Sequence, residues 1–168
     1  MLAAFFIALT ATAAPAQSLK ERREICGTCH GATGNSEMDK IPSLAGQPEL
    51  FITNQLILMR EGIRVVPPMA EFVKGMKDDD IVALAQHYAK QAPVASKEPV
   101  DPALAKRGGE IAAKTRCASC HLPTYAGREQ IPRLAKQRID VLIEAMTAYR
   151  DNRRSGSDTT MIGVMQGI

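Results

Sequence analysis

The chain contains four cysteines, and all of them fall in two copies of the pattern Cys-x-x-Cys-His. On a helical turn, residues i, i+3 and i+4 share one face, so two thiols and one imidazole project to the same side. This arrangement suits covalent attachment of a c-type haem, in which both sulfurs bond to the porphyrin edge and the imidazole binds iron. The candidate haem-binding residues are Cys26, Cys29, His30, Cys117, Cys120 and His121.

Three other kinds of site use Cys-x-x-Cys pairs, and the context of each copy disfavours them. A thioredoxin-like redox pair needs a βαβ unit, but no strand-like alternation flanks either copy. Zinc ribbons usually separate their two pairs by roughly 15–20 residues, whereas 87 residues lie between Cys29 and Cys117. Two disulfides would leave the histidine after each pair unexplained. We therefore expect two covalently bound haems.

Alignment of the two motifs reveals an internal repeat of the kind that marks a duplicated structural unit. Residues 41–47 (IPSLAGQ) match residues 131–137 (IPRLAKQ), and Arg64 matches Arg154. The repeat predicts two domains, at residues 17–92 and 103–168, and the proline-containing segment 93–102 between them is typical of a linker.

Both units are predicted to be helical, because apolar residues recur at helical spacing and no segment alternates as a strand would. Ser18 and Glu21 fit a capping box, and Asp101 followed by Pro102 fits a helix start. Beyond the helix that starts at Ser18, the expected helices cover residues 48–60, 78–90, 103–114 and 138–150. The predicted fold is all-α, with two tandem domains that each wrap around one haem.

The second unit is shorter than the first. After Met69 the first unit continues for about 20 residues and builds a helix, whereas only seven residues follow Met161. We therefore expect the second domain to lack its C-terminal helix.

Residues 1–16 have the character of a signal peptide. Residues 2–9 are almost wholly apolar, and Ala14-Pro15-Ala16 resembles a small-residue cleavage site, although no Lys or Arg precedes the apolar run. This run is far shorter than the ~20 residues of a membrane-spanning helix. We expect export to the bacterial periplasm, outside the cytoplasm, where c-type haem is attached.

The sixth iron ligand decides between electron transfer and chemistry, because Met/His ligation suits a carrier and an open position suits substrate binding. Of eight methionines, only Met69 and Met161 match each other in the repeat, each in an expected loop some 40 residues after its motif. The predicted iron ligands are therefore His30, Met69, His121 and Met161. His87, the one remaining histidine, has no match in the second unit and is expected to be an ordinary surface or core residue.

Groups around each iron ligand can be predicted in outline. A ligating imidazole normally donates its second N–H to a carbonyl or carboxylate, and the carbonyls of Pro42 and Pro132 are candidate acceptors. The candidate partners of the haem propionates are Gln47, Gln137, Arg64 and Arg154.

The chain resembles a two-domain dihaem cytochrome c of the cytochrome c4 type, each half being similar to a class I cytochrome c domain. The resemblance is carried by residues 26–31, 34–35, 41–47 and Met69 in the first half, and by 117–121, 132–135 and Met161 in the second. It implies His/Met ligation of both irons and a proline carbonyl on each histidine. Leu122 departs from the pattern, since glycine is usual after the motif histidine.

The resemblance implies a periplasmic one-electron carrier of a respiratory chain, soluble or loosely held at the membrane, and no catalytic acid, base or nucleophile stands near the motifs. Two alternatives remain: a cytochrome subunit of a larger dehydrogenase or oxidase complex, and a dihaem peroxidase. The first alternative requires a permanent partner protein, and the second requires an iron with an open coordination position.

Charge is distributed unevenly between the units. Residues 17–92 carry 9 basic and 10 acidic side chains, and residues 93–168 carry 12 and 8. Such asymmetry can orient a carrier toward a redox protein partner, such as a membrane oxidase, reductase or dehydrogenase. The basic residues are scattered without interleaved aromatic residues, which argues against nucleic acid as a partner.

Overall fold

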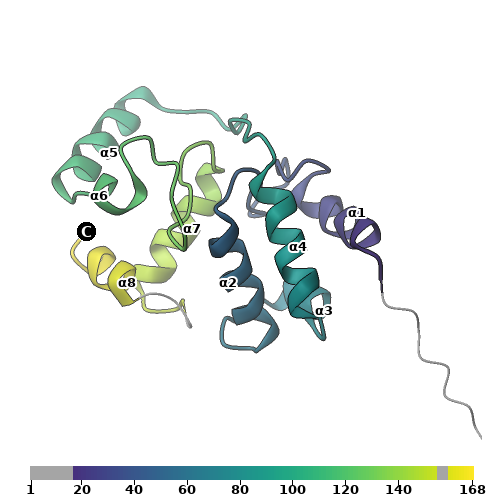
Figure 1. Cartoon of the computed structure of the whole chain (residues 1–168). Coiled ribbons are helices and arrows are strands. Elements are labelled where there is room, and N and C mark those ends of the chain that lie inside the picture. Colours follow the sequence, from purple (N-terminus) through teal and green to yellow (C-terminus); the bar gives the residue numbers. More distant parts are fainter. Residues whose placement is uncertain (1–16, 155–158) are drawn as a thin grey trace, which may run out of the picture.

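The computed structural model describes residues 17–154 and 159–168, and the predicted signal peptide at 1–16 lies outside them. The described residues form eight helices and a single isolated bridge between Arg128 and Ile131. The prediction of an all-α fold is therefore confirmed. Figure 1 shows α1–α4 on one side of the molecule and α5–α8 on the other, joined by an extended segment. We call these two groups the first and the second repeat.

The first repeat contains α1 (Leu19–His30), α2 (Glu49–Arg60), α3 (Pro67–Val73) and α4 (Asp78–Ala89). Helix α4 packs against α2 and α1, and its buried side chains form most of one hydrophobic core. Ile81 and Ala85 are fully buried there. The core consists of Ile52, Val73, Met76, Ile81, Leu84, Ala85 and Tyr88.

The predicted capping box starts α1. The Glu21 N–H donates to Ser18 Oγ at 3.3 Å, and the Ser18 N–H donates to Glu21 Oε2 at 2.8 Å. These bonds satisfy main-chain donors that a helix start otherwise leaves without partners. Helix α1 then carries the first Cys-x-x-Cys-His motif in its final turns and ends at His30.

The second repeat contains α5 (Pro102–Lys114), α6 (Ala118–His121), α7 (Ile139–Arg150) and α8 (Thr159–Gln166). Asp101 caps α5 as predicted, accepting from the N–H groups of Ala103 and Leu104. Helix α5 therefore begins at Pro102, one residue inside the predicted linker.

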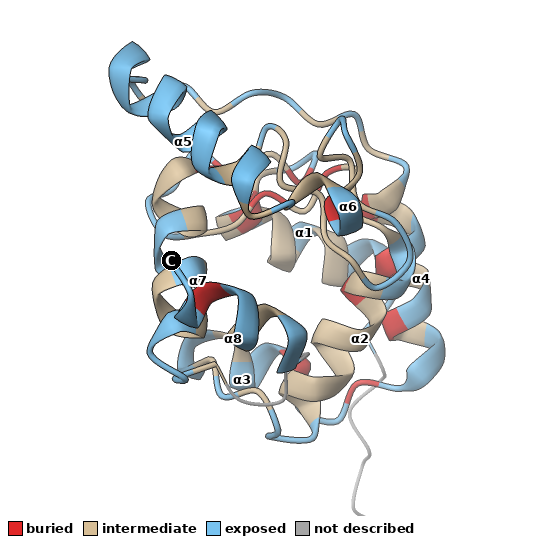
Figure 2. Cartoon of the chain, turned by 90° about the vertical axis from the view of Figure 1, so that its left-hand side faces the viewer, coloured by how far each residue is buried: buried red, intermediate tan, exposed pale blue. Residues whose placement is uncertain are grey.

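The described residues of the second repeat form α5 to α8 and no counterpart of α4. Leu104 and Ile111 of α5 are 57% and 48% exposed, and α5 is almost entirely exposed in Figure 2. Met165 is the only apolar side chain that is buried among the described residues of this repeat. The second repeat thus has almost no protein core of its own.

Both candidate methionines lie in short helices, so their predicted placement in loops is wrong. Met69 is the third residue of α3, and Met161 is the third residue of α8. Pro67 opens α3 because proline suits the first helical position, where its missing N–H is not needed. The two helices preserve the repeat, since each methionine takes the same position in its helix.

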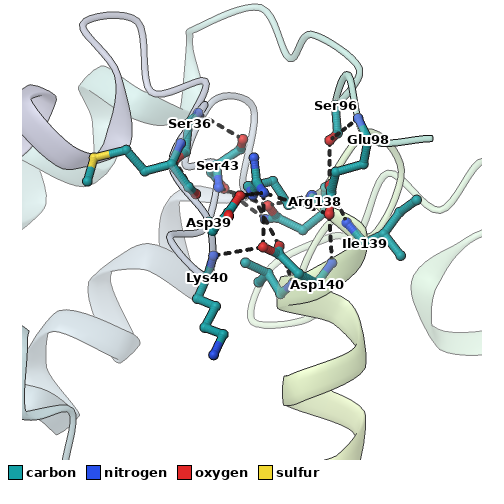
Figure 3. A network of polar contacts seen from close by, with 12 residues as sticks. Ser36, Asp39, Lys40, Ser43, Ser96, Glu98, Arg138, Ile139 and Asp140 are labelled. Atoms are coloured by element: carbon teal, nitrogen blue, oxygen red, sulfur yellow. Dashed lines mark hydrogen bonds and ion pairs between the residues drawn. The ribbon is translucent and has the colours of Figure 1, made fainter.

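A polar network joins the two repeats around Arg138, whose side chain is 7% exposed (Figure 3). Its guanidinium donates to Asp39 of the first repeat at 2.8 Å and to Asp140 at 2.9 Å. Asp140 also accepts from the Lys40 N–H at 2.8 Å. Glu98, from the segment between the repeats, accepts from the first N–H groups of α7, at Ile139 and Asp140. One arginine thus holds both repeats and the segment between them.

This network predicts a weaker contact between the repeats in acid. The hydrogen bond from Arg138 lowers the pKa of Asp140 to about 2. Because the carboxyl pKa is lower in the folded protein than in the unfolded chain, its stabilisation is complete above pH ~4 and is lost as the pH falls toward 2. We expect the free energy of unfolding to fall across that range and to fall less in Asp140→Asn, measured by denaturant titration at each pH. An equal fall in both proteins would contradict the prediction.

Candidate haem sites

Each motif histidine is buried and held by the proline carbonyl that the sequence predicted. His30 and His121 are 6% and 5% exposed. The Nδ1 of His30 lies 2.8 Å from the Pro42 carbonyl oxygen, and the Nδ1 of His121 lies 2.9 Å from that of Pro132. A carbonyl can only accept, so Nδ1 carries the proton and the Nε2 lone pair is left for a metal. Burial also lowers the pKa of His30, which favours the neutral, ligating form.

In the second repeat, residues of the motif and the candidate methionine line one cavity of about 350 Å³. Cys120, His121 and Met161 come together there from α6 and α8, although 40 positions separate the last two in sequence. The remaining lining residues are Phe51, Asn54, Gln55, Leu58, Gln130, Ile131, Pro132, Tyr149 and Thr160.

One wall of this cavity belongs to the first repeat, which the sequence did not predict. Phe51, Asn54, Gln55 and Leu58 lie on α2. Nothing in the local pattern of these residues points to a site in the other repeat. Their role depends on how the repeats pack, and only the structure supplies that information.

In the first repeat, the motif and the candidate methionine pack against the same hydrophobic core. Cys26 and Met69 are partly buried and pack against the cluster that contains Tyr88. Burial raises the pKa of the Cys26 thiol. The apolar environment around both sulfur atoms suits a porphyrin, most of whose surface is hydrophobic.

Two partly buried arginines suit an anionic group. Burial and the nearby Arg154 guanidinium lower the pKa of Arg64 to about 10, and burial also lowers the pKa of Arg154. Among the described residues neither makes an ion pair with a carboxylate, and Arg154 Nε is buried without a hydrogen-bond partner. Two neighbouring cations without an acidic partner are costly. Haem propionates would supply the missing negative charge, so these residues fit the cofactor.

The two candidate glutamines and His87 have other partners. Gln47 and Gln137 form hydrogen bonds with main-chain groups of the opposite repeat, which is a role that we did not predict. His87 lies in α4, where its Nδ1 is 3.3 Å from a guanidinium nitrogen of Arg23. The assignment of His87 as an ordinary structural residue stays a prediction.

Leu122 follows the second motif in a backbone conformation that favours glycine. Its φ of 70° and ψ of 156° lie in a region that residues with a Cβ rarely adopt. Gly31, the matching residue after the first motif, has nearly the same angles, 82° and 147°. The surrounding fold therefore imposes a glycine conformation on a leucine, immediately beside His121.

Leu122→Gly should stabilise the haem-loaded protein. Relief of the backbone strain should raise the free energy of unfolding by about 1–3 kcal/mol. The greater flexibility that glycine gives the unfolded chain should lower it by about 0.5–1 kcal/mol. We expect a net increase of up to about 2.5 kcal/mol in the free energy of unfolding, measured by denaturant titration. Gly31→Ala is the matched control and should destabilise, because its Cβ would collide with the Asn35 carbonyl. A destabilised Leu122→Gly variant would contradict the assignment of strain.

Two structural features are absent from residues 17–154 and 159–168. Within these ranges, no group of three or more His, Cys, Asp or Glu side chains is arranged to hold a separate metal ion. Across the same ranges, no helix has both the length and the apolar character that crossing a membrane requires.

Comparisons with known proteins identify similar sequences and folds. No family model matches the chain. Cytochrome c4 of Pseudomonas aeruginosa is 31% identical over 95% of the chain and 82% of that protein. The thiosulfate dehydrogenase electron acceptor of Thiomonas intermedia is 30% identical over 85% of the chain and 69% of that protein. The crystal structure of reduced recombinant cytochrome c4 from Pseudomonas stutzeri has a TM-score of 0.80 at 27% identity, covering 91% of the chain and 92% of that structure.

Proposed function

The chain belongs to the cytochrome c4 family of dihaem electron carriers, and from this premise we propose how its residues hold and use the two haems. The protein is a c-type cytochrome with two haems, and it carries electrons without being an enzyme. We propose that Cys26 and Cys29 attach one haem, and that Cys117 and Cys120 attach the other. The two units would extend over residues 17–92 and 103–168.

In this proposal Met69 and Met161 would supply the second ligand of each iron, in addition to His30 and His121. The observation that carries it is the shared cavity of the second repeat, where His121 and Met161 line the same space. The equivalent positions of the two methionines in α3 and α8 extend the assignment to the first repeat. Bound haem supplies one-electron cycling between ferrous and ferric iron.

The surrounding residues keep each site fixed during that cycle. The Pro42 and Pro132 carbonyls set the orientation of the two imidazoles and increase their basicity. Phe51 and Leu58 of α2 would shield the second haem from water, and Arg64 and Arg154 would offset the negative charge of its propionates. A rigid, fully ligated site changes little between oxidation states, which suits a carrier and leaves no position for a substrate.

The proposed location is the bacterial periplasm, where the family's members work. The proposed partners are a membrane-bound oxidase or reductase, with loose peripheral association at the membrane surface. A second candidate partner is a dehydrogenase, because one relative is named as the electron acceptor of thiosulfate dehydrogenase. In that case the chain would serve as the cytochrome subunit of a complex.

Carbon monoxide binding to the reduced, purified protein tests the proposal. If both haems have His/Met ligation, addition of carbon monoxide should leave the ferrous absorption spectrum unchanged. The intact mass of the protein should include both haems. Stoichiometric binding to one haem would instead indicate an open iron position and favour the peroxidase alternative. Stopped-flow mixing with a thiosulfate dehydrogenase and with a terminal oxidase then distinguishes the two partner classes, by which of them exchanges electrons faster.

A further inference from the structure

Two glutamines form matching contacts across the boundary between the repeats. Gln47 Nε2 donates to the Arg133 carbonyl oxygen, and the Arg133 N–H donates to Gln47 Oε1, both at 3.0 Å. Gln137 Nε2 donates to the Ser43 carbonyl oxygen at 2.9 Å, and the Ser43 N–H donates to Gln137 Oε1 at 2.8 Å. Gln47 matches Gln137 in the repeat, and Ser43 matches Arg133, so each contact is the counterpart of the other.

Each contact reaches the peptide group that holds the motif histidine of the opposite repeat. The Pro42 carbonyl, which accepts from His30, and the Ser43 N–H, which donates to Gln137, belong to one planar peptide unit. In the second repeat, the Pro132 carbonyl accepts from His121, and the N–H of the same unit donates to Gln47. A continuous chain of hydrogen bonds therefore runs from each imidazole, through one amide, to a side chain of the other repeat.

Hydrogen bonds linked in this way strengthen one another. When an amide N–H donates, its carbonyl oxygen becomes more negative and accepts more strongly. A stronger bond to the Nδ1 proton makes the imidazole more basic, and a more basic ligand favours ferric over ferrous iron. Burial increases the effect, because Gln47 is only 4% exposed and Ser43 only 8%.

We propose that Gln47 and Gln137 are positioning residues that lower the reduction potential of the haem in the opposite repeat. This inference rests on the proposed ligation by His30 and His121. It makes the contact between the repeats part of the redox chemistry, because each glutamine tunes the potential of the haem in the other repeat.

Substitution of each glutamine should give a crossed pattern of potentials. Gln47→Leu should raise the potential of the haem at His121 and leave the haem at His30 unchanged, and Gln137→Leu should do the reverse. We expect a shift of about threefold to tenfold in the oxidation–reduction equilibrium constant of one haem, where tenfold is about 59 mV for one electron. Potentiometric titration followed by NMR of the haem ring-methyl groups would assign each potential to its repeat.

Gln47→Glu and Gln137→Glu provide a second test, which remains possible even if the leucine variants do not fold. A carboxylate still accepts from the same N–H and adds negative charge, so the crossed shift should have the opposite sign. Asp140→Asn is the control, because the Asp140 side chain also crosses the boundary, where it accepts from the Lys40 N–H at 2.8 Å, but it has no hydrogen bond to either histidine-holding peptide unit. Its potentials should stay at the wild-type values.

Several results would overturn the proposal. Unshifted potentials, a shift in the same repeat, or equal shifts of both haems would each do so, as would an Asp140→Asn variant that reproduces the glutamine effect. If the wild-type protein shows two reversible haems with His/Met spectra, such a failure concerns the glutamines alone. A wild-type protein without histidine-ligated haems would overturn this inference together with the proposed function.

Discussion

Replacing Met161 by alanine is expected to open one iron to external ligands and to lower its reduction potential. The thioether is the proposed sixth ligand, and it lines the cavity that also contains His121. Because axial ligands set haem potentials over about 0.8 V, its loss should lower the potential of that haem by roughly 100 mV or more. The methionine-to-iron charge-transfer band of one haem should disappear, and the reduced protein should bind one carbon monoxide.

The same change at Met69 should affect the other haem, and the double variant should lose both bands. Met165→Leu is a matched control, because Met165 lies in the same helix as Met161 and is buried, but matches Val73 of the first repeat and not Met69. That variant should keep both bands. A Met161→Ala protein with an unchanged spectrum would remove Met161 from the iron ligands.

Loss of haem attachment should have very different effects on the two repeats. Cys117→Ser with Cys120→Ser should unfold the second repeat, because Met165 is the only buried apolar side chain among its described residues. Burial of one such side chain contributes about 1.5–3 kcal/mol, whereas ordering each residue costs about 1–2 kcal/mol in backbone entropy. Without the porphyrin, this repeat has too little buried surface to offset that cost.

The corresponding change at Cys26 and Cys29 should leave helical structure in the first repeat. Helices α2 and α4 pack directly on each other around Ile81 and Leu84, and most of this core comes from residues outside the motif. Hydrogen exchange followed by mass spectrometry should show rapid exchange in α7 of the first double variant and continued protection in α4 of the second. Ser119→Ala, inside the second motif, is the control that leaves both thiols in place. Equal loss of protection in both repeats would contradict the prediction.

The sequence predicted those features that depend on short-range pattern. Ser18 and Asp101 mark helix starts because their side chains bond to main-chain groups two or three residues away. The proline carbonyls were predictable because a ligating histidine needs an acceptor, and each proline follows its motif closely in both copies. The matched pair Met69 and Met161 emerged from the repeat alone, without any three-dimensional information.

The features that the sequence did not predict depend on contacts between distant segments. The wall that α2 contributes to the second cavity, and the contacts of Gln47 and Gln137, arise only when the repeats dock. The expected loop at Met69 is helix α3 for a different reason: Pro67 and Pro68 precede Met69, and proline is favoured in the first turn of a helix as well as in loops. Local rules therefore identified the candidate ligands, and packing determined their surroundings.

The reciprocal glutamine contacts have the geometry of an isologous interface, in which residue i of one unit meets j of the other and j meets i. Two separate chains, each with a single repeat, could form the same contact as a two-fold symmetric dimer. Covalent fusion replaces that concentration-dependent association by an intramolecular one, with an effective concentration in the millimolar range for a short tether. A modest set of hydrogen bonds is then sufficient to keep the two electron-carrying centres together, even in a highly dilute compartment.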